Sequence, residues 1–223
     1  MTGYRWDWRF VGQSLPFLLG GIATTAKVCL AAAMLVIPLA LVVAALRQSR
    51  FGVLRGVAAV YVDVFRTTPF LVQLVWFFFV LPMLTGYQLA AFETAVLALA
   101  LYIGASEAEV VRAGILSLEV GQREAGVALG MRRFQVYRRI ILPQAMARMI
   151  PPTLNVLIIL IKESAVTSAV SVTDLMWRAG AVATRSYRFL EPLTFAGVTY
   201  LAIIIPLSLA ARWMHRRQRL AFD

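Results

Sequence analysis

The chain has 223 residues, of which 61% are hydrophobic and only 15% are charged. A soluble domain carries about 45–50% apolar and about 25% charged residues, so this composition excludes an ordinary soluble enzyme and a disordered binder. The net charge of +11 does not indicate nucleic acid, because the basic residues lie between long apolar segments. The single cysteine, Cys29, and the single histidine, His215, exclude a disulfide framework and leave almost no material for a metal site.

Five segments are long and apolar enough to cross a bilayer, which takes about 20 residues of helix. They cover residues 18–46, 68–84, 91–116, 146–170 and 192–213. We therefore predict an all-α integral membrane protein with five transmembrane helices in one transmembrane domain, residues 18–213. Residues 1–17 are aromatic and polar and are expected to lie at the membrane interface, and residues 214–223 are expected to form a basic tail.

The arginines predict the orientation of the chain. Most basic residues lie in three regions, which are the link between the first two spans, the link between the third and fourth spans, and the tail. With five spans these regions share one side, and the positive-inside rule makes that side the cytoplasm. We expect the N-terminus outside and the C-terminus in the cytoplasm. Arg178, Arg185 and Arg188 would then lie outside, as a local departure from the rule.

The link at residues 117–145 is long enough to be functional or disordered. Residues 124–129 contain good helix formers, Gly130 is a natural helix C-cap, and Pro143 stands where a new helix can begin. This pattern predicts a short helix, a glycine turn and a second, basic helix, which together form a compact cytoplasmic knob. The alternative is an ordinary basic loop that holds anionic lipid.

The spacing within this link resembles the EAA loop of permease subunits of bacterial ABC importers. The matching positions are Glu124, Ala125, Gly126, Gly130, Ile140, Leu142 and Pro143, with Gly126 in place of the usual alanine. In that family the loop forms a coupling helix that docks on a cytoplasmic ATPase. The resemblance implies an ATPase-coupling role for Glu124, Ala125, Gly126, Gly130, Leu142 and Pro143.

Other stretches resemble polar amino acid permeases of the histidine/glutamine/arginine type. They are residues 66–73, 104–115, 151–155 and 162–164, and with the loop they span roughly residues 60–210. The resemblance implies the type I ABC importer permease fold and a bacterial inner-membrane location. It also implies a cytoplasmic ATP-binding subunit dimer, a second permease subunit (identical or related) and an extracytoplasmic amino acid binding protein as partners, besides membrane lipid.

No phosphate-binding G-x-x-x-x-G-K-[ST] motif and no nucleophile–base pattern occurs in the sequence. We therefore expect a transport subunit that is not itself an enzyme and holds no cofactor, with ATP and Mg²⁺ bound by the partner ATPase. The resulting prediction is a permease that forms the pathway of an ATP-driven amino acid uptake system. The alternative is a self-contained secondary transporter or channel, which has no need of a docking loop.

Charges at membrane depth are costly and indicate functional sites by default. Glu109 and Arg112 are three residues apart on the third span, so we expect a structural ion pair between them. Glu107 points about 200° away from Glu109 around the helix, so it must face something else. A polar translocation pathway is one such surrounding.

The fourth span carries the other candidates for the substrate pathway. Asn155, at mid-span, either bonds across a helix interface or lines the pathway. Lys162, Glu163 and Ser164 lie in the outer half of the span, where lysine can also reach the outer surface. A zwitterionic amino acid needs both a cation and an anion, and this segment offers both.

Overall fold

The computed structural model describes residues 4–118 and 120–222, and this part of the chain is almost wholly helical and contains no β-strand. The all-α prediction is therefore confirmed. The elements in chain order are α1 (Trp8–Arg47), α2 (Gly52–Thr67), α3 (Phe70–Val75), the π-helical turn η1 (Trp76–Val80), α4 (Leu81–Thr85), α5 (Ala91–Leu116), α6 (Val120–Ala128), α7 (Arg133–Val136), the π-helical turn η2 (Tyr137–Ile141), α8 (Leu142–Ser164), the 3₁₀ turn η3 (Ala165–Val170), α9 (Leu175–Ser186) and α10 (Leu190–Phe222).

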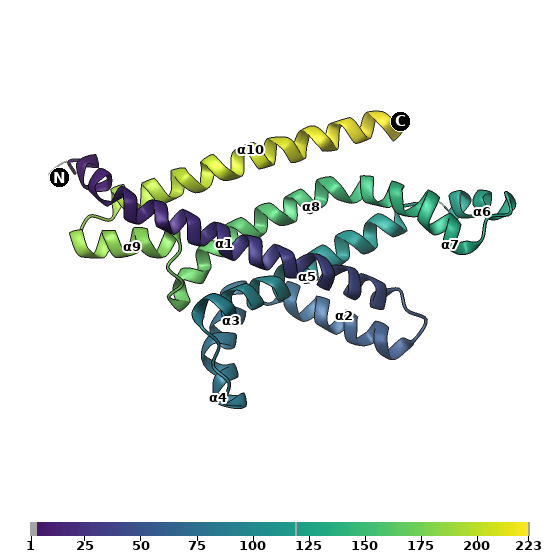
Figure 1. Cartoon of the computed structure of the whole chain (residues 1–223), viewed down its shortest axis with the longest axis horizontal. Coiled ribbons are helices and arrows are strands. Elements are labelled where there is room, and N and C mark those ends of the chain that lie inside the picture. Colours follow the sequence, from purple (N-terminus) through teal and green to yellow (C-terminus); the bar gives the residue numbers. More distant parts are fainter. Residues whose placement is uncertain (1–3, 119, 223) are drawn as a thin grey trace.

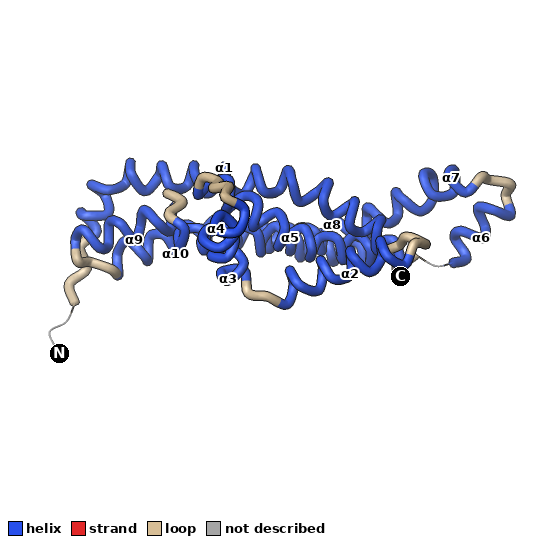
Figure 2. Tube along the Cα trace, turned by 90° about the horizontal axis from the view of Figure 1, so that it is seen from below, coloured by secondary structure: helices blue, strands red, loops and turns tan. Residues whose placement is uncertain are grey.

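Four long helices, α1, α5, α8 and α10, run along the length of an elongated molecule (Figure 1). The N-terminal segment and α9 lie at one end, and α6 and α7 lie at the opposite end, as Figure 2 also shows. The helix pair α3 and α4 projects sideways from this bundle (Figure 1). The two ends are therefore built by separate parts of the chain.

Helix α5 lies at the centre of the bundle and packs against α1 and α8 through small residues. Ala95, Ala98, Ala105 and Ala108 are fully buried. Gly104 lies so close to α1 that an added Cβ would come within 2.8 Å of the Cδ2 atom of Leu39. Small side chains allow membrane helices to approach closely, and this approach replaces the hydrophobic driving force that lipid does not supply.

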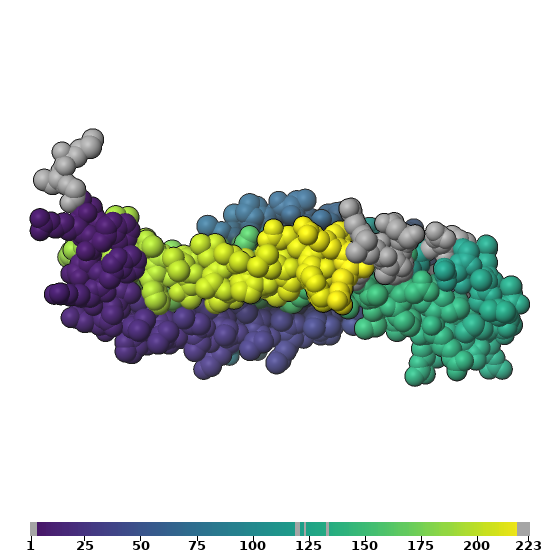
Figure 3. Space-filling view, turned by 90° about the horizontal axis from the view of Figure 1, so that it is seen from above, coloured from purple at the N-terminus to yellow at the C-terminus, as the bar shows by residue number. Residues whose placement is uncertain are grey.

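Helix α10 is the opposite case, because it is hardly covered. In its most apolar stretch 6% of the residues are buried, against 67% in α5. Figure 3 shows α10 lying along the surface of the molecule for most of its length. Ile205, Leu209 and Trp213 are all at least half exposed on it. Apolar surface of this extent indicates lipid or another membrane protein around this helix.

Among the described residues, four helices are long and apolar enough to cross a membrane, and a fifth span is counted when α2 and the α3–α4 run are taken together. The predicted second span, residues 68–84, corresponds to the run α3–η1–α4, which counts as a span only together with α2. The chain bends by 107° between α2 and α3. Thr68 is extended there because it precedes Pro69. The buried Gln73 amide donates to the carbonyls of Phe65 and Thr68, which partly replaces the lost helical bonds.

The third span agrees with its predicted bounds, whereas the others begin earlier. Helix α1 starts at Trp8, with the Asp7 carboxylate accepting from the Arg9 amide, so residues 8–17 belong to the same helix as the predicted first span. The fourth helical run begins at Phe134 and continues to Val170, and Pro143 lies in the first turn of α8 within this run, as predicted. The π turn η2 precedes Pro143 because the proline ring cannot accommodate the regular helical carbonyl four residues earlier.

Candidate functional site

The knob, which we define as residues 120–141, has the predicted helix–turn–helix form. Helix α6 ends in a turn where Gly130 adopts φ +74°. The Met131 amide donates to the Gly126 carbonyl at 3.1 Å and the Gly130 amide to the Val127 carbonyl at 2.9 Å. These bonds satisfy carbonyls that the helix end would leave unpaired. The prediction that Gly130 ends the helix is confirmed.

Gly126 is the position where α6 touches the second half of the knob. It is buried, and an added Cβ would lie 2.9 Å from Val136 Cγ2 and 3.0 Å from Ile140 Cδ1. The departure from the usual alanine therefore has a steric reason in this chain. Glu124 and Ala125 are exposed beside it, so they face away from the knob and are available to a partner.

The knob connects α5 and α8, and these two helices are held together by contacts along their facing sides. The Arg148 guanidinium of α8 donates to the Ser117 carbonyl at the end of α5 at 2.5 Å. One turn further along α5, Gly114 leaves room for the Met149 side chain, which a Cβ there would meet at 2.2 Å. Leu142 and Pro143 form the first turn of α8 beneath the knob. Movement of the knob must therefore move α5 and α8 together.

A cavity of about 820 Å³ lies beside this pair of helices. The lining residues of α5 recur every three or four positions, so they share one face of that helix, and α8 contributes a second row with the same spacing. The lining residues are Arg66, Ser106, Glu109, Val110, Ala113, Gly114, Ser117, Arg148, Pro152, Asn155, Val156, Ile159 and His215. Sequence reasoning identified Asn155 but missed most of this wall. The signal that could have found it is the row of small and polar residues three or four positions apart on both helices.

The predicted ion pair on α5 is confirmed and has a third member. Arg112 Nη2 lies 2.6 Å from Glu109 Oε2, and Arg47 Nε, from the end of α1, lies 3.3 Å from Glu109 Oε1. Glu109 therefore ties α1 to α5 at the wall of the cavity. Both of its oxygens are occupied, so it is an architectural charge in this structure.

Glu107 lies in the interface between α5 and α8 and does not line the cavity. It is 7% exposed, and Thr153 Oγ1 donates to its Oε1 at 2.6 Å. The face opposite Glu109 is thus the α5–α8 contact. The expectation that Glu107 faces the pathway does not agree with this placement, because the partner helix covers that face.

Lys162, Glu163 and Ser164 do not line the cavity either. Lys162 is exposed, Glu163 is half-buried, and Ser164 is fully buried with its hydroxyl on the Ile161 carbonyl. Of the predicted pathway residues, the structure therefore brings only Asn155 to the cavity wall. Lys162, Glu163 and Ser164 lie about two turns beyond Asn155 on the same helical run.

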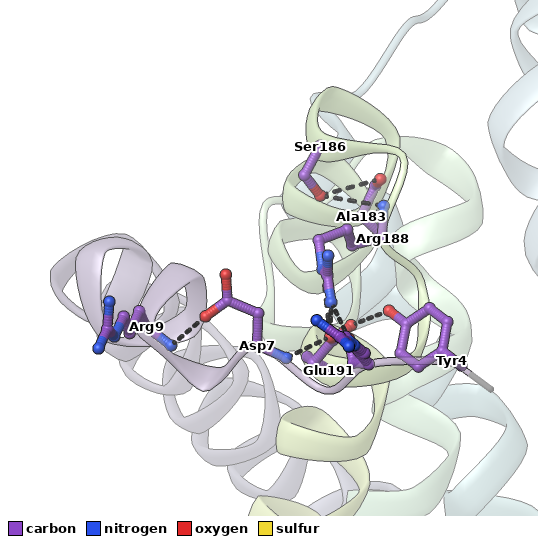
Figure 4. Close-up of polar contacts among 8 residues, drawn as sticks. Tyr4, Asp7, Arg9, Ala183, Ser186, Arg188 and Glu191 are labelled. Atoms are coloured by element: carbon purple, nitrogen blue, oxygen red, sulfur yellow. Dashed lines mark hydrogen bonds and ion pairs between the residues drawn. The ribbon is translucent and has the colours of Figure 1, made fainter. Parts of the chain in front are cut away.

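At the opposite end, four groups form a contact that we call the clasp: Tyr4, the Asp7 backbone, Arg188 and Glu191 (Figure 4). Glu191 is fully buried, its Oε1 lies 2.6 Å from Arg188 Nη2 and 2.9 Å from the Asp7 amide, and its Oε2 accepts from the Tyr4 hydroxyl. This hydrogen bond to Glu191 raises the pKa of Tyr4. Sequence reasoning missed the clasp.

The arginines of the α9 region make packing contacts with the N-terminal segment. Arg178 donates to the Phe17 carbonyl at 2.8 Å and lies over the Phe17 ring at 4.8 Å. Arg188 donates to the Arg5 carbonyl as well as to Glu191. These charges hold α9 and the start of α10 against the N-terminal segment, so they serve packing rather than topology.

In the part of the chain that the structure describes, no three His, Cys, Asp or Glu side chains gather as metal ligands would. The arrangement offers a cavity, a rigid helix pair beside it and an exposed knob.

The sequence is similar to known transport proteins over nearly all its length. The profile of the family described as "Binding-protein-dependent transport system inner membrane component" matches residues 36–220. The arginine transport system permease protein ArtQ of Bacillus subtilis is 36% identical over 203 residues, covering 91% of this chain and 93% of the relative. The glutamate/aspartate import permease protein GltK of Escherichia coli is 32% identical, covering 96% and 99%.

A solved structure gives the same result for the fold. A chain from the crystal structure of an amino acid ABC transporter with histidines superposes with a TM-score of 0.89 at 31% identity. The match covers 96% of this chain and all of that one. The fold therefore extends over the whole bundle and is not limited to a shared motif.

Proposed function

This chain belongs to the family of binding-protein-dependent transport system inner membrane components, and from that membership we propose that it forms the pathway for amino acid uptake. It is a membrane-spanning permease subunit of the ABC transporter type. Relatives named for arginine and for glutamate/aspartate transport support an amino acid as the cargo.

The observation that carries this proposal is the rigid connection between the knob and the cavity. The knob joins the ends of α5 and α8, and both helices line the cavity and are strapped by Arg148 and Ser117. A force applied to the exposed face of α6 must therefore change the shape of the cavity. Glu124, Ala125, Gly126 and Gly130 form the docking turn, and Leu142 and Pro143 transmit its movement into α8.

The energy for this movement comes from a cytoplasmic ATP-binding subunit dimer, which holds ATP and Mg²⁺. The absence of a phosphate-binding motif from this sequence supports a separate ATPase. An extracytoplasmic amino acid binding protein would deliver the cargo to the α9 end. The uncovered apolar surface of α10 supports a membrane neighbour, for which a second permease subunit is the proposed partner in addition to lipid.

The proposed orientation places α6 in the cytoplasm and α9 outside, in a bacterial inner membrane. Gln122 and Thr184 are exposed at opposite ends and can test it. In a Cys29→Ser background, a cysteine at Thr184 is expected to react with an impermeant thiol reagent in intact cells, and one at Gln122 is not. Labelling of the Gln122 position from outside would contradict both the orientation and ATPase docking.

A self-contained secondary transporter or channel is not favoured, because the chain matches ABC permeases throughout. The deciding experiment is reconstitution of the chain with its co-purifying ATP-binding subunit in vesicles. We expect uptake of radiolabelled amino acid only when ATP is enclosed on the side of the knob. Uptake at the same rate without ATP would support the alternative.

A further inference from the structure

A group of buried polar side chains lies where α1, η3, α9 and α10 meet, and we call it the polar joint. Asp174, Ser164 and Thr167 have no exposed surface, and Thr25 is 6% exposed. The fifth member is Tyr200 of α10, whose hydroxyl is buried and interacts electrostatically with Asp174, Thr25 and Ser164. Polar groups are rarely buried together unless their hydrogen bonds are satisfied.

Most of the hydrogen-bonding capacity of the polar joint is used. The Asp174 Oδ1 atom caps α9 by accepting from the Trp177 amide at 2.8 Å, and the Leu175 amide donates to Thr25 Oγ1 at 3.2 Å. The hydroxyls of Ser164 and Thr167 donate to backbone carbonyls within their own helical turns. Two buried atoms of the polar joint have no hydrogen-bond partner among the described residues, and they are Asp174 Oδ2 and the Tyr200 hydroxyl oxygen.

No positive side chain in the described part of the chain pairs with this carboxylate. Arg178, one turn along α9, directs its guanidinium to the Phe17 and Thr173 carbonyls. From α1 the joint receives only Thr25 and the Cys29 thiol, from the α8–η3 run Ser164 and Thr167, and from α10 Tyr200. A buried carboxylate without a paired cation is costly in its charged form.

We propose that the polar joint is a proton-binding site, in which Asp174 takes up one proton on Oδ2, the oxygen that lacks a partner. Proton uptake removes the uncompensated charge while Oδ1 continues to cap α9. Burial raises the pKa of Asp174 to about 6, from an ordinary value of 3.8. The site therefore titrates near pH 6.

The position of the polar joint gives its protonation a structural consequence. Asp174 and Leu175 lie where α9 packs closely on α1, because a Cβ added to Gly21 would lie 2.8 Å from the Leu175 Cα and 3.0 Å from the Asp174 carbonyl oxygen. A negative charge at this contact favours loosening that lets water reach the carboxylate. The contact is expected to be tighter at low pH than at neutral pH. In the proposed orientation the proton comes from outside, and only this statement rests on the proposed topology.

The sign of the effect on stability follows from linkage. Because folding raises the pKa of Asp174, the folded chain binds the proton more tightly than the unfolded chain. The stabilisation is complete below about pH 4 and is lost as the pH rises through 6. The test is the Tm of the purified full chain in lipid nanodiscs between pH 5 and 7.5, for the wild type and for Asp174→Asn.

We expect the difference in Tm between the two proteins to change with a midpoint near pH 6, with the wild type losing stability as the pH rises. Asparagine caps helices well and is neutral at every pH, so this variant tests charge without removing the cap. Asp63→Asn, at an exposed carboxylate on α2, is the matched control and should follow the wild type.

A second measurement holds even if Asp174→Asn does not fold. Infrared difference spectra of the wild type and of Asp63→Asn, between pH 5 and 7.5, should each show one protonated-carboxyl band lost near pH 6. A difference in Tm that does not vary with pH, or the absence of that band, would overturn the proposal. A midpoint that moves when sodium replaces choline at constant pH would also overturn it, because the carboxylate would then hold a metal cation.

Discussion

At one end of this molecule, Gly126 packs on Val136 and Ile140, which are only ten and fourteen residues further along the chain. At the other end, Tyr4 donates to Glu191 across 187 residues, and Arg178 reaches Phe17 across 161. The knob is thus built from contacts within one short segment, whereas the clasp joins the two ends of the sequence. Both ends are helical, so the difference lies in how each is held.

This difference assigns different work to the two ends. A knob whose internal contacts all come from one short segment can move as a unit and can pass that movement to α5 and α8. A clasp between distant segments fixes α1, α9 and α10 relative to one another, so it resists movement. We therefore expect changes in the knob to alter coupling at constant stability, and changes in the clasp to alter stability at constant coupling.

The largest effect on transport is expected from Gly130→Val. A β-branched residue at φ +74° is strained by about 1–3 kcal/mol, so the turn must reshape. Uptake should fall about tenfold or more, with normal insertion and nearly normal Tm. Gly121→Val is the matched control, because no atom lies within 4 Å of a Cβ there. Equal uptake in both variants would show that coupling does not need the turn at Gly130.

The largest effect on stability is expected from Arg188→Met, which leaves the fully buried Glu191 without its cation. The Tm should fall by several degrees, while the ratio of uptake to ATP hydrolysis in the surviving protein stays unchanged. Arg185→Met is the control, since Arg185 is exposed and lies 6.0 Å from the Phe17 ring. A changed ratio in Arg188→Met would show that the clasp takes part in coupling.

A smaller effect is expected from Thr153→Val, in the contact between α5 and α8. It removes the hydroxyl that donates to Glu107 Oε1 and leaves a buried carboxyl without that partner, at about 1–2 kcal/mol. The number of substrate molecules carried per ATP should fall. Thr199→Val is the control, because the Thr199 hydroxyl bonds only within its own helix. Identical ratios would mean that Glu107 and Thr153 do not transmit movement.

The smallest effect is expected from Gly126→Ala, which introduces the usual residue of related loops into this knob. Its Cβ would meet Val136 at 2.9 Å, so we expect a loss of about 1 kcal/mol and a modest fall in uptake. The double variant with Val136→Ala should recover both. If the second substitution adds to the loss, the contact between these two residues is not the cause.

The sequence predicted well what depends on neighbouring residues. The bounds of α5, the Glu109–Arg112 pair and the positive φ of Gly130 follow from apolar length, helical spacing and glycine at a helix end. The bend before α3 and the π turn η2 were missed because each depends on how the helix relaxes around a proline.

The clasp and the burial of Glu107 could not be predicted for a different reason. Helical spacing states which face a charge occupies, but not which helix covers that face. Glu107 lies opposite Glu109 as expected, yet the covering element is Thr153 on α8 rather than an open pathway. Glu191 gives no local sign that its partners are Tyr4 and the Asp7 amide.

The central claim, that the exposed face of α6 docks the ATPase, is tested most directly by the stoichiometry of the purified complex. An ATP-hydrolysing subunit should co-purify with the chain in a one-to-one molar ratio, measured by quantitative mass spectrometry. Glu124→Lys, on the exposed face of α6, should lose that subunit, whereas Glu93→Lys, the same charge reversal in the first turn of α5, should keep it. Equal capture by both variants would contradict the account.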